Sequence, residues 1–221
     1  MHVLAGQRAD LGVKFVGANT VCTACRTRHA ARLRVGQDER MKKATRRSPD
    51  ANVTPATRVL AGADVVFALH RFDHDPRATD YGQEAVRALG VDAAQVFKTL
   101  VLSSGDGADF GGLLVAVLPV QCQLDLRLAA CALGVPRAQL ADPSLASRVT
   151  GYVVGGISPL GQRHRLATVL DGAARTQERI FVSAGRRGME VEVAPGDLIR
   201  ILDAVVAPVT RVAAADPPTG Y

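Results

Sequence analysis

From residue 53 onward, apolar and polar residues alternate in short, regular patterns, and these patterns predict short helices interleaved with short strands. Thr54 followed by Pro55 is typical of a helix start, and Gly90 and Gly134 are typical helix stops. The predicted helices span 54–63, 82–89, 124–133, 143–149 and 195–202. The predicted strands span 64–72, 96–103, 112–118, 166–170, 179–183, 189–193 and 205–212. This irregular order predicts an α/β fold of the α+β type rather than a doubly wound sheet.

The first 50 residues differ from the rest in charge and pattern. They contain eleven Lys and Arg against four Asp and Glu, whereas the remaining residues contain sixteen against seventeen. Their periodicity is weak, and Ser48-Pro49-Asp50 is typical of a break between elements. We therefore expect a basic, flexible extension at 1–50, a folded domain at 51–212 and a frayed tail at 213–221. Because the folded part is near neutral, nucleic-acid contacts there need a local patch.

The composition is that of a globular protein. Hydrophobic residues make up 48% of the chain, aromatic residues only 4%, and Trp is absent. We expect Ala, Val and Leu to fill the core, and no aromatic platform for stacking nucleobases. The sequence shows no secretory signal and no apolar stretch of membrane-spanning length, so the four cysteines are expected to be free thiols in the cytoplasm.

The most unusual segment is the glycine-rich stretch Thr150–Gly161. Its backbone N–H groups are suited to bind an oxyanion or a phosphate, although a purely structural turn is an equal alternative. The segment matches neither the Walker nor the dinucleotide pattern. Lys98 lies in an apolar strand, where it either points into a pocket or lies on the wet face of the sheet. Ser158 lacks the second glycine of a nucleophile elbow, and no Ser–His–Asp order is convincing.

Two basic turns and one histidine-rich segment remain. Arg163 and Arg165 flank His164, and Arg186 and Arg187 lie between glycines; each pair would suit a phosphate backbone or form an ordinary solvated turn. The segment His70–Pro76 has no compact metal-ligand spacing, and a solvated strand end is the favoured interpretation. We expect no metal site.

Several segments together resemble the YbaK/EbsC family of free-standing transfer-RNA editing proteins. They occur in family order at family spacing: His70–Pro76, Tyr81–Gly82, Phe97–Leu100, Gln123–Leu126, Ala141–Pro143, Thr150–Gly161, Val182–Gly188 and Pro195–Leu198. The resemblance implies a mixed, barrel-like sheet surrounded by helices, similar to the editing domain of bacterial prolyl-tRNA synthetases. The form of Thr150–Gly161 resembles that of the Cys-tRNA(Pro) deacylases, which also cleave Cys-tRNA(Cys).

The resemblance also implies roles for individual residues. Lys98 would be the key active-site side chain, and Gly155 and Gly156 would donate N–H groups near the ester. The implied substrate-binding residues are Phe72, Tyr81, Thr99, Ser158, Pro159, Ser183 and Glu190. The implied tRNA contacts are Arg163, Arg165, Arg186 and Arg187. The thiol of the substrate itself would attack the ester and leave as a thiolactone, so no protein nucleophile, metal or cofactor is implied.

Four residues depart from the family pattern: Phe72 replaces a tyrosine, Tyr81 a phenylalanine, Glu190 an aspartate and Ala184 a glycine. These changes leave the selectivity open. The sequence thus predicts a cytoplasmic hydrolase, with lyase-type thiolactone release as an option, that removes cysteine from misacylated tRNA. Its expected partners are that tRNA and a prolyl- or cysteinyl-tRNA synthetase, with no membrane. The alternatives are a deacylase for another small amino acid such as alanine, and a non-catalytic module that binds tRNA or a synthetase.

Overall fold

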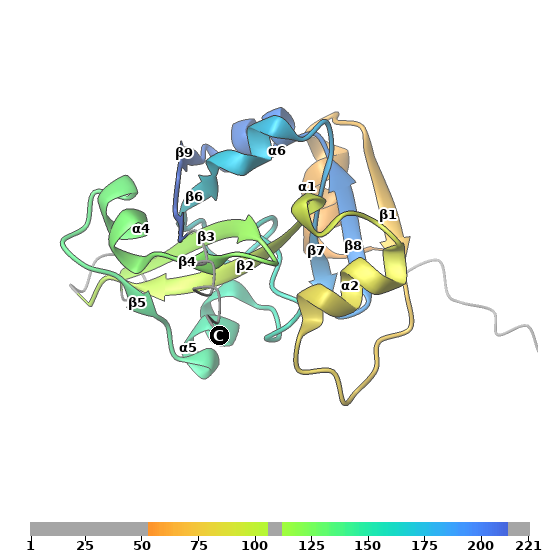
Figure 1. The fold of residues 1–221 in the computed structure, drawn as a ribbon, viewed down its shortest axis with the longest axis horizontal. Coiled ribbons are helices and arrows are strands. Elements are labelled where there is room, and N and C mark those ends of the chain that lie inside the picture. Colours follow the sequence, from red (N-terminus) through yellow and green to blue (C-terminus); the bar gives the residue numbers. More distant parts are fainter. Residues whose placement is uncertain (1–52, 106–111, 212–221) are drawn as a thin grey trace, which may run out of the picture. The chain divides into compact units, whose positions relative to one another are not determined.

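A computed structural model describes residues 53–105 and 112–211 (Figure 1). The expected extension at 1–50 and tail at 213–221 lie outside these residues. The helices are α1 (Pro55–Gly62), α2 (Tyr81–Leu89), α4 (Leu126–Ala132), α5 (Pro143–Thr150) and α6 (Pro195–Leu202), with 3₁₀ turns η2 (Ala93–Gln95) and η3 (Gly172–Thr176). The strands are β1 (Phe67–Arg71), β2 (Val96–Ser103), β3 (Leu113–Pro119), β4 (Gln123–Leu124), β5 (Gln139–Leu140), β6 (Ala167–Asp171), β7 (Ile180–Arg186), β8 (Met189–Val193), β9 (Val205–Ala207) and β10 (Thr210–Arg211).

The helix ends follow from short polar residues and glycines. Thr54 caps α1 in a capping box with Thr57, and Pro55 occupies the first turn, as predicted. Asp80 accepts a hydrogen bond from Gln83 N at the start of α2, which satisfies one of the free N–H groups there. Gly90 ends α2 in the left-handed conformation, as predicted. These caps fix where α2 begins, and Tyr81 is its first residue.

The main sheet is mixed, as expected, and follows the order β1-β8-β7-β2-β3-β6-β9. The pairs β1/β8, β7/β8 and β2/β3 are antiparallel, whereas β2/β7, β3/β6 and β6/β9 are parallel. In Figure 1, β2 and β3 run across the view, whereas β7 and β8 run steeply up and down beside them, so the sheet bends strongly between β2 and β7. Within the described chain the order is open, with β1 and β9 at its two ends.

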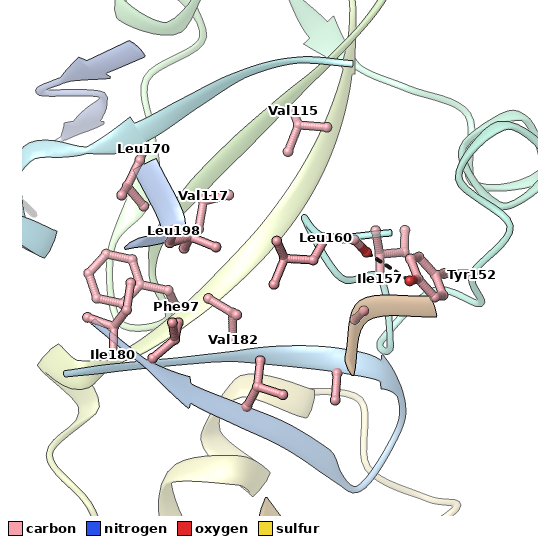
Figure 2. Close-up of a cluster of buried hydrophobic side chains, with 14 of the residues drawn as sticks. Phe97, Val115, Val117, Tyr152, Ile157, Leu160, Leu170, Ile180, Val182 and Leu198 are labelled. Atoms are coloured by element: carbon pink, nitrogen blue, oxygen red, sulfur yellow. Dashed lines mark hydrogen bonds between the residues drawn. The ribbon is translucent and has the colours of Figure 1, made fainter. Parts of the chain in front are cut away.

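The largest core cluster lies on the inner side of this bend. Figure 2 shows Phe97, Val182, Ile180 and Leu198 packed together, and the same cluster extends to Leu160 beyond Val182. Every residue of β3 is buried, because a second cluster with α4 covers its other face. Removing this apolar surface from water is the main stabilising term. The core is built mostly from Leu, Val, Ile and Ala, in agreement with the scarcity of aromatic residues.

One edge of β2 is only partly paired. On this side β7 pairs with Val96 and Phe97, and β5 pairs with Leu102 and Ser103. Between them, Ala141 N donates to Val101 O (3.0 Å). Residues 98–100 therefore have no strand partner on this side among the described strands. The separation of β7 from β2 leaves a gap in the sheet beside Lys98.

Candidate active site

A pocket of about 470 Å³ lies at this gap in the sheet. Six of the residues implied by the resemblance line it together: Tyr81, Lys98, Thr99, Gly155, Ser183 and Glu190. Its remaining wall is mostly apolar and comes from β2, α2, α5 and the segment 154–157. A mostly apolar cavity with a few convergent polar groups is the usual form of a small-molecule site.

Strand register explains why three of these polar side chains meet. Ser183 lies opposite Glu190 in the β7/β8 pair, and side chains at paired positions share one face of a sheet. Phe97 pairs with Val182, so the residues that follow them, Lys98 and Ser183, share the opposite face. Phe97 and Val182 point into the core (Figure 2), and Lys98, Ser183 and Glu190 therefore point away from it.

Lys98 is half-buried, and its Nζ donates a hydrogen bond to the carbonyl of Val120 (3.0 Å). Burial lowers the pKa of this ammonium, while the negative charge of Asp80 opposes that shift. An ammonium has three N–H donors, so the bond to Val120 leaves two that can hold an anion or a carbonyl oxygen.

Glu190 is 9% exposed, and burial raises its pKa to about 8. At neutral pH this side chain is therefore mainly a neutral carboxylic acid, which can donate as well as accept a hydrogen bond. Burial alone accounts for this shift, and no hydrogen bond or neighbouring charge of the described residues contributes to it. The side chain is thus a polar group in the pocket wall.

Thr99 presents a second polar group of this kind. Its Oγ1 is buried and has no partner among the described residues. A buried hydroxyl without a hydrogen bond costs about 1–3 kcal/mol, so such groups are rare in stable cores. Thr99 is also a lining residue of the pocket, so this hydroxyl without a partner belongs to the pocket wall.

The two loop glycines have different surroundings. Gly155 has a φ of 83°, and a Cβ added there would lie 2.6 Å from the Tyr81 ring, so only glycine fits without strain. Gly156 packs against the backbone of Arg186 and Arg187, and its N–H donates to Val153 O (2.9 Å). Gly155 lines the pocket and Gly156 does not. In this conformation the N–H of Gly156 is already used, so Gly155 is the glycine of the pair that can offer a donor to a ligand.

Three other residues implied by the resemblance lie outside the pocket wall. Phe72 packs with Val96 and Phe181 under α2. Ser158 is fully buried, and its Oγ accepts a hydrogen bond from Leu160 N (3.2 Å). Pro159 lines a different, smaller cavity. These side chains support the loop and the core rather than the pocket surface.

The arginines of the first basic turn also lie away from the pocket. Arg163 donates to the carbonyl of Arg148 (3.4 Å) and packs beside Gly151. Arg165 is exposed and lies 3.9 Å from a carboxylate oxygen of Asp203. Neither residue lines the pocket.

The second basic turn lies against the glycine-rich loop. Arg186 and Arg187 are both exposed at the end of β7 and in the turn that follows. The Arg187 guanidinium donates to Val154 O from both Nε (2.9 Å) and an Nη (2.8 Å), and it lies over the Tyr81 ring at 4.8 Å from the centroid. This basic turn therefore contacts two residues of the pocket wall, Val154 and Tyr81.

Sequence reasoning missed two features near the site. Asp80 lines the pocket, and its negative charge raises the pKa of Lys98. Its position as the N-cap of α2 is the sequence signal that could have identified it. The expectation of a solvated strand end is wrong for His74, whose side chain is only 17% exposed because its Nδ1 contacts Glu84 at 2.8 Å. The described residues include no group of three or more His, Cys, Asp or Glu that could hold a metal ion.

Comparison with known proteins decides the family. The sequence profile of the aminoacyl-tRNA editing domain matches residues 75–201, which is more than half of the chain and contains every polar pocket residue described above. The chain belongs to this family. The segment that forms the pocket is thus also the segment that defines an aminoacyl-tRNA editing domain.

Individual relatives agree with this assignment. The editing domain is 33% identical over 128 residues to the Enterococcus faecalis protein EbsC, which is named as a candidate Cys-tRNA(Pro)/Cys-tRNA(Cys) deacylase; the match covers 58% of this chain and 76% of EbsC. The crystal structure of hypothetical protein APE2540 matches with a TM-score of 0.62 and 25% identity over 72% of this chain and all of that chain. A candidate trans-editing enzyme for prolyl tRNA synthetase matches in fold, with a TM-score of 0.58 and 23% identity over 72% of this chain and 99% of that one. No helix in the described part of the editing domain is long and apolar enough to cross a membrane.

Proposed function

We propose that this editing domain hydrolyses Cys-tRNA(Pro), and also Cys-tRNA(Cys), with the help of the substrate's own thiol. The observation that carries the proposal is the composition of the pocket wall. It combines a half-buried ammonium, a glycine of the loop and a buried carboxyl group, and no His or Cys is among its described residues. Such a site can bind and polarise an ester but has no imidazole to activate a protein nucleophile.

The substrate thiol fills this role in the proposed reaction. Its sulfur attacks the ester carbonyl carbon, a C–S bond forms, and the bond from that carbon to the ribose oxygen breaks. The thiol loses its proton in this step, and the ribose oxygen takes up a proton and leaves as the free hydroxyl of the tRNA. The released cysteine thiolactone then reacts with water to give cysteine. The first step is of the lyase type, and the net reaction is a hydrolysis.

Lys98 and Gly155 are the proposed catalytic groups. Negative charge develops on the carbonyl oxygen as sulfur attacks, and the free N–H donors of Lys98 together with the N–H of Gly155 would stabilise it. Loss of one preorganised donor of this kind costs about 2.7–4 kcal/mol in the barrier. Gly156, whose N–H is bonded to Val153 O, would support the loop conformation rather than contact the ester.

Glu190, Ser183, Thr99 and Tyr81 would bind the aminoacyl group. A buried carboxyl group is suited to the positively charged α-amino group, because the bound cation would lower the pKa of Glu190 below 8 and ionise it. The unpaired hydroxyl of Thr99 would gain its missing partner from the same ligand.

We further propose that the choice of tRNA depends on a partner synthetase, either prolyl- or cysteinyl-tRNA synthetase. The support is the near-neutral charge of residues 51–221, which gives the editing domain no general attraction for RNA. We also propose that this reaction serves quality control in translation in the cytoplasm. Arg163, Arg165 and Arg186 remain predicted tRNA contacts.

The decisive test is the rate of deacylation of Cys-, Ala- and Ser-tRNA(Pro) and Cys-tRNA(Cys) by the wild type and by Lys98→Ala. We expect rapid loss of the two cysteinyl esters alone, with the rate reduced at least about 100-fold in Lys98→Ala. Arg200→Ala removes an exposed charge on α6 and is the control. Faster loss of the alanyl ester would replace cysteine by alanine as the substrate. No turnover of any ester would favour a binding module.

A further inference from the structure

Arg187 contacts the glycine-rich loop in a way that a contact with tRNA would not require. Two of its N–H groups converge on a single acceptor, the carbonyl of Val154, at 2.9 and 2.8 Å. Its guanidinium also lies over the Tyr81 ring, at 4.8 Å from the centroid. A lysine could reproduce the charge but not this forked bond combined with stacking, because only the guanidinium is planar with several fixed donors.

The bonded carbonyl belongs to the peptide that carries the N–H of Gly155. Peptide units are planar, and the described chain contains no cis peptide bond. The N–H of a trans peptide points opposite to its C=O, so fixing Val154 O also fixes the direction of Gly155 N–H, which faces away from the guanidinium. A cationic donor on the carbonyl also polarises the peptide and makes its N–H a better donor.

The ring under the guanidinium is held from other sides as well. Tyr81 is in close contact with Gly155, and its ring lies 5.7 Å from that of His74 at a tilt of 44°. His74 is held by Glu84, 2.8 Å from its Nδ1. Gly156 packs on the backbone of Arg187 itself. The β7–β8 turn, the loop and the start of α2 therefore meet at Arg187, beside the pocket.

We propose that Arg187 is a positioning residue that orients the Gly155 N–H for the reacting ester. The proposal rests on the proposed deacylase function for its kinetic consequence, but its structural consequence is independent of that function. It assigns to Arg187 a different role from the tRNA contact that the sequence predicts, and the two roles differ in what they change. A positioning residue affects the rate at which the bound substrate reacts, whereas a phosphate contact affects tRNA affinity and its dependence on salt.

The kinetic test compares Arg187→Lys and Arg187→Ala with the wild type and with Arg200→Ala in the full-length protein. We expect both Arg187 variants to lower kcat for Cys-tRNA(Pro) at least about 10-fold, with KM and the slope of log affinity against log salt changed little, and Arg200→Ala to match the wild type. The proposal is overturned if Arg187→Lys retains full kcat, or if Arg187→Ala mainly raises KM and reduces the salt slope by roughly 0.7–0.9.

A second measurement separates failure of the proposal from failure of the proposed function. Amide hydrogen exchange followed by NMR needs no substrate. We expect the amide of Gly156, whose N–H is bonded to Val153 O, to exchange at least about 10-fold faster in Arg187→Lys than in the wild type, while amides of α6 keep their rates. Unchanged exchange at Gly156 would overturn the positioning role whichever ester is the substrate. Accelerated exchange in a protein that cleaves no ester would retain the loop contact and reject the deacylase.

Discussion

The carboxyl group of Glu190 is held neutral by its surroundings, and this has a consequence for stability. Burial raises its pKa to about 8 from an ordinary value of 4.5, so between these values the folded protein binds more protons than the unfolded chain. The contribution of Glu190 to the free energy of unfolding therefore falls as pH rises from about 5 to 8, with a slope of up to about 1.4 kcal/mol per pH unit.

Glu190→Gln should remove this slope. We expect urea unfolding of the variant to give a free energy of unfolding that depends less on pH between 5 and 8, and a more stable protein than the wild type at pH 8. Glu178→Gln removes an exposed carboxyl group and serves as the control. An identical pH dependence in Glu190→Gln and the wild type would show that Glu190 is ionised in the folded protein.

The hydroxyl of Thr99 leads to a prediction in which stability and activity change in opposite directions. Its Oγ1 is buried without a partner in the described structure, so Thr99→Val exchanges an unsatisfied polar group for a methyl group of similar size. We expect the free energy of unfolding to rise by about 1 kcal/mol, and deacylation of Cys-tRNA(Pro) to slow. A loss of stability of 1 kcal/mol or more would mean that the hydroxyl has a partner inside the folded protein.

At the scale of elements, the glycine-rich loop depends on close contacts that only glycine permits. Gly155→Ala would place a Cβ 2.6 Å from the Tyr81 ring in a backbone conformation with φ of 83°. A non-glycine residue in this region costs about 1–3 kcal/mol. We expect thermal unfolding to show a loss of this size, together with loss of deacylation. Gly62→Ala is the matched control, because nothing lies within 4 Å of its added Cβ at the end of α1; equal effects of both changes would contradict the contact with Tyr81.

The sequence predicted the longer elements well because their periodicity and caps are local. The bounds of β2, β8 and α6 agree with the predicted ranges 96–103, 189–193 and 195–202. The two-residue strands β4, β5 and β10 were missed as separate strands, since such segments are too short for periodicity and depend on partners distant in sequence.

The site likewise depends on both local patterns and contacts between segments distant in sequence. Motifs alone could place Lys98, Ser183 and Glu190 on strands, but the pocket exists because β7 leaves β2 after Phe97, and no local pattern encodes that separation. The use of Gly156 N–H within the loop and the bonds of Arg187 to Val154 are equally non-local. Only the structure therefore shows which of the residues implied by the resemblance line the pocket and which support the loop and the core.

At the scale of the whole molecule, charge is divided unevenly between the first 50 residues and the rest. All of the net positive charge comes from the segment 1–50, and the remainder of the chain is near neutral. If this segment supplies phosphate contacts, tRNA affinity should fall steeply with salt, with a slope of roughly 0.7–0.9 per contact. Replacing Arg26, Arg28, Arg32 and Arg34 by Gln in the full-length chain should then flatten the slope of log affinity against log salt, without altering kcat at saturating tRNA.

The opposite result would identify a different source of affinity. An unchanged slope in the fourfold variant, measured by filter binding between about 50 and 200 mM salt, would place the contacts in the folded domain. The exposed arginines Arg163, Arg165 and Arg186 would then be the residues to replace next. Because these side chains lie outside the pocket wall, their loss should weaken binding across tRNAs, while selectivity for the amino acid would still be set by the pocket.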